Sequence, residues 1–486
     1  MPQETDAEKI ARLERKIEQL ERENERLRRA LEEALRAARR QAAPFSKRAP
    51  QANPNKPGRN EGSGYGRTAH RAIPPPIDET VEAPLPRRCP RCRGTVQETA
   101  VVDQYQTEIP EPRVHCLRFR VHLGRCRRCG RPVQGRHPRQ TSDELGAAGS
   151  QLGPRALALA AELNKGLGLP YGKVASVLRE AFACEVTRGG LCRAIARAGR
   201  KSEPTYRGLI QQLNRSPQLT PDETGWKVAG RLWWLWAFVT ADLTVYSIQP
   251  GRGFEQSAAI LRPDYAGGMA RDGWGVYRRY QGAVQQSCLN HLSRRCREMI
   301  EVAGPAAARF PHRVRQILQQ ALELRDRREE DGISVQGLAV VRGRLEARLD
   351  RLLAVRYRSP ANERFANHLW RERNCLFTFL YCPGLDATNY RAEQAIRPAV
   401  VTRKVWGGNR TPAGARTQEI LASVIRTCHQ RKLSAQAVLV HLLCSVQPAT
   451  LALAHGDLPP PRRWERSAHP APVRWIQRRA GCVQAR

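Results

Sequence analysis

Two aspartates in the middle of the chain stand where an apolar segment gives way to polar, glycine-containing sequence. Asp222 lies in the segment 218–228 (QLTPDETGWKV), and Asp272 follows the apolar segment 266–270. Carboxylates are hard oxygen ligands that suit Mg²⁺, an ion that keeps several waters and takes further ligands from substrate phosphates. The two acids therefore indicate metal-assisted phosphoryl transfer if the fold brings them together.

A third carboxylate would complete such a centre. The segment 388–397 (TNYRAEQAIR) has a helical pattern that includes Glu393, with three residues available for packing, Ala392, Ala395 and Ile396. Three carboxylates can hold two Mg²⁺ ions, which activate a water or a 3′-hydroxyl and stabilise the leaving oxygen of a phosphodiester. Because the chain has 46 acidic residues, three ordinary surface charges are the alternative explanation.

The segments around the aspartates predict the opening of a ribonuclease-H-like fold. They alternate as strand, strand, strand, helix and strand over residues 218–228, 231–240, 244–249, 254–261 and 266–270. Ala229 and Gly230 join the first two strands as a hairpin. The first and fourth strands are neighbours in that fold, so Asp222 and Asp272 would converge on one edge of the sheet. We expect an α+β multidomain protein with an α/β catalytic core over residues 211–440.

Glu393 lies much farther along the chain from Asp272 than a compact core of this kind needs. Residues 301–372 carry leucine and valine at helical spacing among many arginines. We therefore expect a mostly helical insertion within the core, one that grips DNA ends.

Residues 5–40 predict a coiled coil. Apolar residues alternate at spacings of three and four, and the seam holds a single polar residue, Asn24. Such a seam favours two parallel strands in one register, and hence a homodimer. The alternative is a solvated helix that packs on its own protein. The following residues, 41–76, are rich in proline, glycine and basic side chains and predict a flexible linker.

Residues 77–140 predict a zinc-binding ribbon. Two CxxC pairs, Cys89 with Cys92 and Cys126 with Cys129, are each followed by a glycine, Gly94 or Gly130. Two such pairs supply the four thiolates of a tetrahedral structural Zn²⁺ site. Redox CxxC motifs are the alternative, but they need a helix directly after the first cysteine, and residues 86–94 offer none.

Residues 150–210 have a helical pattern that resembles a helix-turn-helix. Helices are expected at 156–163 and 170–182, and at 190–198 with Thr187 as N-cap. DNA binding by this region and a plain helical spacer are equally consistent with the pattern. At the other end of the chain, residues 456–486 are rich in proline and arginine and predict a disordered basic tail.

The charge of the chain points to a polyanionic partner. The sequence has 82 Lys+Arg against 46 Asp+Glu, a net charge of +36, and nine tryptophans. This balance favours nucleic acid as the partner. The N-terminus has no apolar signal segment, and the most apolar stretch, residues 232–239, is far shorter than the roughly 20 residues of a membrane span. We therefore expect no membrane association, and a reducing cytosol despite the 14 cysteines.

Several basic and aromatic residues lie close to the three acids in sequence. Their predicted role is contact with the DNA backbone, and the alternative is a solvated basic face; they are Arg294, Arg295, Arg397, Arg403 and Lys404. Cys288 and His291 make only half a zinc site, so His291 is expected near the active edge instead, where it would touch DNA. Trp226 and Trp274 are expected to pack rather than to stack on a base.

Three blocks of this sequence resemble, in order and spacing, conserved blocks of the insertion-sequence-66 transposase family. They are DETGW, RDGWGVY with CLNHLSRR, and RAEQAIRPAVVTRKVWGGNRTPAGA. The resemblance implies a DDE transposase with two Mg²⁺ ions at Asp222, Asp272 and Glu393, acting in the bacterial cytosol on the nucleoid, with accessory proteins of the same element as further partners. The chain departs from the family at two positions. Asn389 is followed by Tyr390 where the family usually has a second Asn, and Glu393 is followed by Gln394 where the family usually has Arg.

Two other functions remain alternatives. One is a non-catalytic DNA-binding regulator, or degenerate transposase, which would be expected to have lost acids. The other is a ribonuclease-H-like nuclease without strand transfer, which would have no use for the coiled coil and the ribbon. The presence of all three acids favours DNA strand cleavage and strand transfer.

Overall fold

The computed structural model describes residues 12–14, 16–21, 23–27, 77–109, 112, 114–146, 151–445, 450–451 and 453. They belong to two compact units, Met1–Pro110 and Glu111–Arg486. The predicted linker at 41–76 and the predicted tail at 456–486 lie outside the described residues, as do Ile10, Leu31 and Ala34 of the predicted coiled-coil seam. Among the described helices, none is long and apolar enough to cross a membrane.

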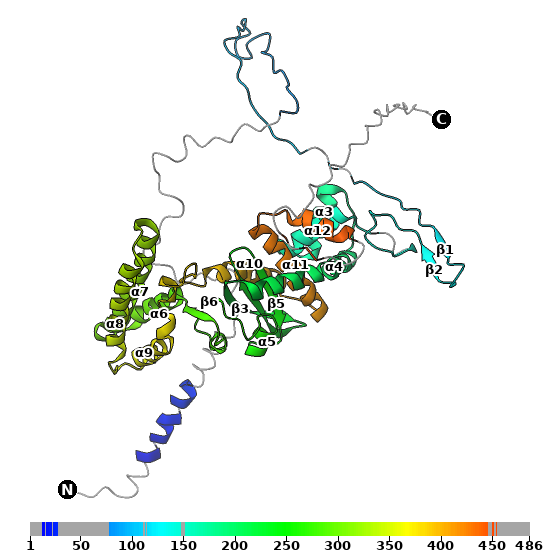
Figure 1. Cartoon of the computed structure of the whole chain (residues 1–486). Coiled ribbons are helices and arrows are strands. Elements are labelled where there is room, and N and C mark those ends of the chain that lie inside the picture. Colours follow the sequence, from blue (N-terminus) through cyan, green and yellow to red (C-terminus); the bar gives the residue numbers. More distant parts are fainter. Residues whose placement is uncertain are drawn as a thin grey trace, which may run out of the picture. The chain divides into compact units, whose positions relative to one another are not determined.

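In the first unit, the described residues between 12 and 27 are helical (Figure 1). Four seam residues of the predicted coiled coil are each more than half exposed: Leu13, Ile17, Leu20 and Leu27. An apolar stripe that stays exposed along a helix marks a surface for another chain.

The second unit is built on a five-stranded sheet in the order β5-β4-β3-β6-β7. Its strands are β3 (Gln218–Val228), β4 (Arg231–Val239), β5 (Thr244–Gln249), β6 (Gly268–Arg271) and β7 (Val284–Ser287). The first three are antiparallel, and β6 and β7 run parallel to β3. The predicted neighbours, the first and fourth strands, do lie side by side. The polar strand β7 had no counterpart in the sequence-based prediction.

The hairpin between β3 and β4 follows from its turn. Ala229 and Gly230 both have positive φ, at 51° and 76°, which is the requirement of the two-residue turn that matches strand twist. The predicted hairpin is confirmed. The predicted short helix also forms, as α5 (Phe254–Ala258), three residues shorter than expected.

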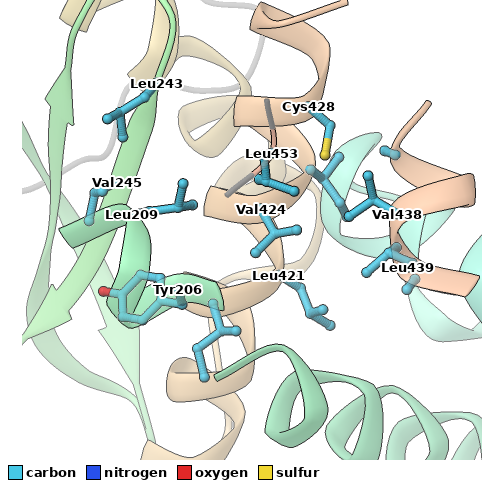
Figure 2. Close-up of a cluster of buried hydrophobic side chains, with 14 of the residues drawn as sticks. Tyr206, Leu209, Leu243, Val245, Leu421, Val424, Cys428, Val438, Leu439 and Leu453 are labelled. Carbon is cyan, nitrogen blue, oxygen red and sulfur yellow. The ribbon is translucent and has the colours of Figure 1, made fainter. Parts of the chain in front are cut away.

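One face of the sheet packs on a helical layer. Its helices are α2 (Pro154–Ala161), a π-helical turn (Glu162–Gly166), α3 (Tyr171–Phe182), α4 (Arg188–Arg215), α11 (Pro412–Gln430) and α12 (Ala435–Cys444). Figure 2 shows the cluster that joins them to the strands, with Tyr206 and Leu209 of α4 between Val245 of β5 and Val424 of α11. Residues 151–215 therefore share a hydrophobic core with the sheet.

Helix α4 begins as predicted and ends later. Thr187 is its N-cap, and its hydroxyl accepts the N–H of Gly190. The helix was expected to end at residue 198, but it continues through Pro204 to Arg215. Its buried face continues with Tyr206, Leu209 and Leu213, so burial of this stripe outweighs the one backbone hydrogen bond that proline cannot donate.

The opposite face of the sheet is covered by α10 (Tyr390–Trp406). Ala392, Ala395 and Ile396 are buried against Trp226 and neighbouring strand residues, as the helical pattern predicted. The Tyr246 hydroxyl on β5 donates to the carbonyl of Ala395 at 2.6 Å. The helix that carries Glu393 is thus held to the sheet by apolar packing and by a buried hydrogen bond.

The edge strand β5 is closed by side chains of α11. The N–H groups of Thr244, Tyr246 and Ile248 donate to Thr427, Ser423 and Glu419 at 3.2, 2.8 and 2.7 Å. Four residues of helix rise about 6 Å and two residues of strand about 6.6 Å. The two spacings nearly match, so a helix with acceptors every fourth residue can satisfy alternate N–H groups of the strand and cover this edge of the sheet.

The predicted helical insertion is confirmed as helical. It follows α6 (Leu289–Val302) and consists of α7 (Pro305–Asp331), α8 (Val335–Leu353) and α9 (Pro360–Glu372). These helices have a hydrophobic cluster of their own, which begins at Leu289 and ends at Ala387. The cluster is separate from the two that cover the sheet faces.

A glycine-containing loop after α10 returns to the sheet. Asn409 forms backbone hydrogen bonds with Lys227 and Ala229, each at 2.9 Å, and its side-chain oxygen accepts the indole N–H of Trp226 at 2.8 Å. Gly408 has a φ of +112°, and a Cβ at this position would lie 2.3 Å from the carbonyl oxygen of Lys227. The backbone that this loop approaches is the protein's own strand β3.

We predict that Gly408→Ala destabilises the protein more than Gly407→Ala. Gly407 also has positive φ, +80°, but a Cβ there meets open space, so the expected cost is about 1 to 2 kcal/mol of backbone strain. At Gly408 a backbone clash is added, and the expected loss is roughly 3 kcal/mol or more. Thermal unfolding of the two variants measures the difference. Equal losses of Tm would show that the loop does not press against β3.

Candidate active site

The two predicted aspartates are brought together by the register of β3 and β6. Gln218 pairs with Gly268 and Leu219 with Met269, and the pairing ends there. If the same register is continued, Asp222 comes opposite Asp272. Side chains at equivalent positions of neighbouring strands point to the same face of a sheet. Both carboxylates are half-buried.

The pKa of Asp222 is affected by the charges of the other two acids. Burial and the negative charges of Glu223, Asp272 and Glu393 together raise its pKa to about 8, against the opposing effect of the Glu223 N–H. The three predicted acids therefore belong to one electrostatic centre. A bound cation would favour the ionised forms that their mutual repulsion disfavours.

Glu223 points away from Asp222, to the other face of the sheet. It is buried and forms an ion pair with Arg252 at 2.5 Å, and the hydroxyl of Tyr277 donates to its other oxygen. The Arg252 guanidinium lies 4.0 Å from the ring centre of Trp274. The backbone N–H of Trp274 donates to the Asp272 carboxylate at 2.8 Å. This chain of contacts joins the two aspartate segments, and sequence analysis did not identify Glu223 or Arg252.

Glu393 lies in the first turn of α10, where the positive end of the helix dipole favours a carboxylate. Its carboxylate is 3.5 Å from the Nε2 atom of His291 on α6, and both side chains are about one-third exposed. His291 therefore lies beside one of the three acids, in line with its expected place near the active edge. Contact of His291 with DNA stays a prediction.

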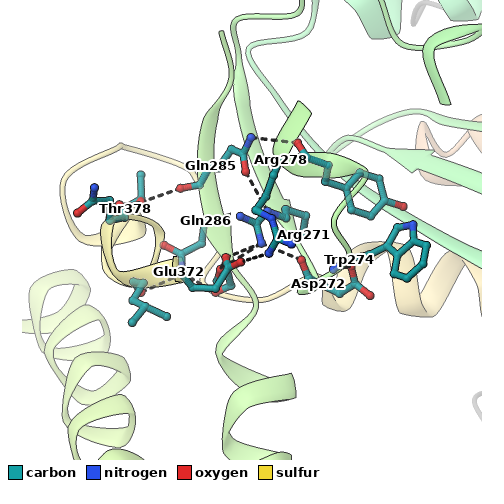
Figure 3. A network of polar contacts seen from close by, with 12 residues as sticks. Arg271, Asp272, Trp274, Arg278, Gln285, Gln286, Glu372 and Thr378 are labelled. Carbon is teal, nitrogen blue, oxygen red and sulfur yellow. Dashed lines mark hydrogen bonds and ion pairs between the residues drawn. The ribbon is translucent and has the colours of Figure 1, made fainter. Parts of the chain in front are cut away.

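A buried carboxylate from the end of the insertion supports the Asp272 segment (Figure 3). Glu372, at the end of α9, is fully buried and accepts hydrogen bonds from Arg271 at 2.6 Å, from Arg278 at 2.7 Å and from Ser287. Burial alone would raise the pKa of Glu372, but the charge of Arg271 and these hydrogen bonds lower it. Arg271 directly precedes Asp272 and donates to its carbonyl at 3.0 Å. Sequence analysis did not identify this network.

The three acids suit Mg²⁺ by their chemistry, although no three Asp, Glu, His or Cys side chains in the described part of the chain form a complete ligand cluster. All three donors are hard carboxylates, as Mg²⁺ requires. Three buried polar atoms in the residues around Glu393 have no protein partner, the two amide atoms of Asn389 and the Nδ1 atom of His291. Buried polar atoms without a protein partner are expected to face water or a ligand.

The two cysteine pairs form knuckles with the same local hydrogen bonds. In one, the Cys89 N–H donates to Gly94 and the Arg93 N–H to Cys89; in the other, the Cys126 N–H donates to Arg131 and the Gly130 N–H to Cys126. The second knuckle lies between β1 (Leu123–Arg125) and β2 (Pro132–Gln134). Positive φ occurs at Arg93 and Gly130, so Arg93, and not Gly94, makes the first turn.

Backbone N–H groups in each knuckle stabilise a thiolate. They lower the pKa of Cys89, chiefly from Cys92 and Arg91, and that of Cys126, chiefly from Cys129 and Arg128. A thiolate is the form of cysteine that binds metals. Each knuckle taken by itself therefore suits a metal-binding pair.

The five basic residues predicted to bind DNA have different surroundings. Arg294, Arg397 and Lys404 are exposed. Arg295 lies over the ring of Phe365 at 4.6 Å, and Arg403 donates to the Thr224 hydroxyl at 3.2 Å and to the carbonyl of Gly225. Trp226 is fully buried, as expected for a packing residue, while Trp274 is 36% exposed beside Arg252.

Comparison with known proteins gives one family match. The model of the family described as Transposase IS66 family matches residues 149–417. The matched range includes the five-stranded sheet, the insertion and α10, and hence all three acids. No curated protein matches the chain.

We predict that Glu372→Gln destabilises the protein by about 3 kcal/mol, because two arginines lose a buried charge partner. The exposed pair of Arg262 and Asp264 supplies the control, since Asp264→Asn should cost less than about 1 kcal/mol. Because the pKa of Glu372 is lowered in the folded state, its ion-pair stabilisation is complete above the unfolded pKa and is lost as the pH falls through the folded pKa. The Tm difference from wild type should therefore be full at neutral pH and shrink below about pH 4. A pH-independent difference would contradict the ionic role.

Proposed function

Because the chain belongs to the IS66 transposase family, whose model spans more than half of it, we propose that it cleaves and transfers DNA strands during transposition. Asp222, Asp272 and Glu393 are the proposed catalytic acids. The observation that carries this proposal is the shared register of β3 and β6. Glu393 is supplied by α10, the helix that packs on one face of the same sheet. The adjacency of the first and fourth strands in the sheet supports the proposed ribonuclease-H-like core.

The three acids are proposed to hold two Mg²⁺ ions. When bound, the ions would stabilise the charge on the phosphoryl oxygens and favour deprotonation of the attacking water or 3′-hydroxyl. The protein's own part is to hold the acids in place. The backbone N–H of Trp274 orients the Asp272 carboxylate, and the imidazole of His291 flanks the Glu393 carboxylate.

A non-catalytic regulator with a decayed core is less consistent with the site. Such a protein has no need of the buried carboxylates Glu223 and Glu372, each of which is costly without its arginine partners. Both are fully paired and lie next to an aspartate segment. The supporting residues are thus present along with the acids.

The proposed partner is DNA, in keeping with the net charge of +36. The proposed backbone contacts are those predicted from the sequence, Arg294, Arg295, Arg397, Arg403 and Lys404. Binding of Zn²⁺ by Cys89, Cys92, Cys126 and Cys129 is likewise a proposal, supported by the local form of each knuckle. Action on the bacterial nucleoid and accessory proteins of the same element are what the family resemblance adds.

The proposed oligomer is a homodimer through the coiled coil at residues 5–40. Its support is the exposure of Leu13, Ile17, Leu20 and Leu27 along one helix. A dimer would hold two catalytic units together, as the joining of two transposon ends requires.

We predict that Asp272→Asn abolishes cleavage of DNA that carries the ends of the element, in the presence of Mg²⁺. The loss should exceed about 100-fold, since changes beyond the direct ligands of a metal already cost 10- to 100-fold. Asp264→Asn, an exposed position before β6, is the matched control and should retain activity. Equal cleavage by the intact chain and by Asp272→Asn would overturn the catalytic assignment.

Leu20→Asp is expected to convert the dimer to monomer, because a charge in the apolar seam must be desolvated on pairing. Gln19→Asp adds the same charge one residue away, outside the seam, and should leave the dimer intact. Sedimentation of both variants measures the mass. A dimer that survives Leu20→Asp would refute pairing through this helix.

A further inference from the structure

A basic groove lies between α6 and α7 and opens beside Glu393. Its volume is about 430 Å³. Its charged and amide-bearing lining residues are Asn290, Arg294 and Arg297 of α6, Arg315 and Gln319 of α7, and Glu393 of α10. One end of the groove thus belongs to the candidate active site.

The two helices place these side chains on facing surfaces. Asn290, Arg294 and Arg297 are spaced four and three residues apart, which puts them on one side of α6. Arg315 and Gln319 are four residues apart on α7. Arg295 falls on another side of α6 and contacts Phe365, so two neighbouring arginines in the sequence have separate surroundings.

The charge of the groove is not balanced by the protein. Arg294, Arg297 and Arg315 face a single carboxylate, Glu393. None of the three forms an ion pair or hydrogen bond among the interactions found in the described residues, and Arg294 and Arg297 are exposed. Guanidinium groups left free along a groove attract phosphate oxygens, with which they form strong charge-assisted hydrogen bonds.

We propose that this groove binds the phosphodiester backbone of the DNA strand that enters the catalytic centre at Glu393. The proposal rests on the proposed transposase function and adds the path of the substrate. Arg294 and Arg297 are separated by about 4.5 Å of helix rise, which lets them bind neighbouring phosphates of one strand. The groove lining contains no aromatic side chain, so it offers no platform for base stacking. Its contacts are therefore independent of base sequence.

In a second groove, between α7 and α8, the positive charges are more nearly balanced by acidic side chains. Its volume is about 680 Å³, and Arg327, Arg344 and Arg348 line it together with Glu323 and Asp326. None of the three catalytic acids lines it. The same insertion therefore provides a matched control with equal arginine content and lower net charge.

The test compares Arg297→Gln/Arg315→Gln with Arg327→Gln/Arg344→Gln in the full chain. DNA that carries an end of the element is titrated at several salt concentrations without divalent metal. Loss of two phosphate contacts should make the negative slope of log K against log salt shallower by roughly 1.8, at about 0.9 per contact. The α7–α8 variant should keep the slope of the wild type. Equal slopes for all three proteins would overturn the proposal.

The position of the strand is tested with uncharged methylphosphonate linkages next to the cleavage point. These linkages should weaken binding by the wild type and leave the Arg297→Gln/Arg315→Gln variant without further loss. If the losses of binding from the uncharged linkages and from the double variant were additive, the groove would contact another part of the DNA, which would contradict the proposal. Cleavage by the intact chain, compared with Asp272→Asn, reports separately on the catalytic acids, so either proposal can fail while the other holds.

Discussion

The candidate active site depends on the register between β3 and β6. Only Gln218 with Gly268 and Leu219 with Met269 are paired, yet these pairs decide that Asp222 and Asp272 meet. A shift of one residue would turn one aspartate to the opposite face of the sheet. The alignment has an electrostatic cost, because burial and the neighbouring acids raise the pKa of Asp222 to about 8. The surrounding structure must hold these acids together against their repulsion.

Two buried ion pairs next to the aspartates provide that support. Glu223 directly follows Asp222 and is held by Arg252 and Tyr277 on the other sheet face. Arg271 directly precedes Asp272 and is held by Glu372. Because side chains alternate along a strand, each strand can present an acid to one face while its neighbour is anchored on the other. Paired charges of this kind specify a position even where their net stabilisation is small.

Local patterns predicted the parts of this site that depend on local structure. An apolar run and a two-residue turn identified β3 and β4, and helical spacing identified the buried face of α10 around Glu393. Strand β7 escaped prediction because its polar side chains find partners far from the strand in sequence. The Gln286 side chain donates to the carbonyl of Leu376 and accepts the N–H of Phe379, about ninety residues later. Glu372 escaped for the same reason. Its partner Arg271 is about a hundred residues away in sequence, and no spacing rule singles out one acid among 46.

The helical region that comprises α6 and the insertion contacts the centre through both of its ends. Helix α6 brings His291 to Glu393, and the end of α9 brings Glu372 to the residue before Asp272. The apolar cluster between these points is continuous from Leu289 to Ala387, and packed helices move as units because close-packed interiors resist local deformation. DNA bound along α6 would therefore act on the position of His291 beside Glu393. The insertion is in this way a structural part of the active site, although the chain adds it between the second and third acids.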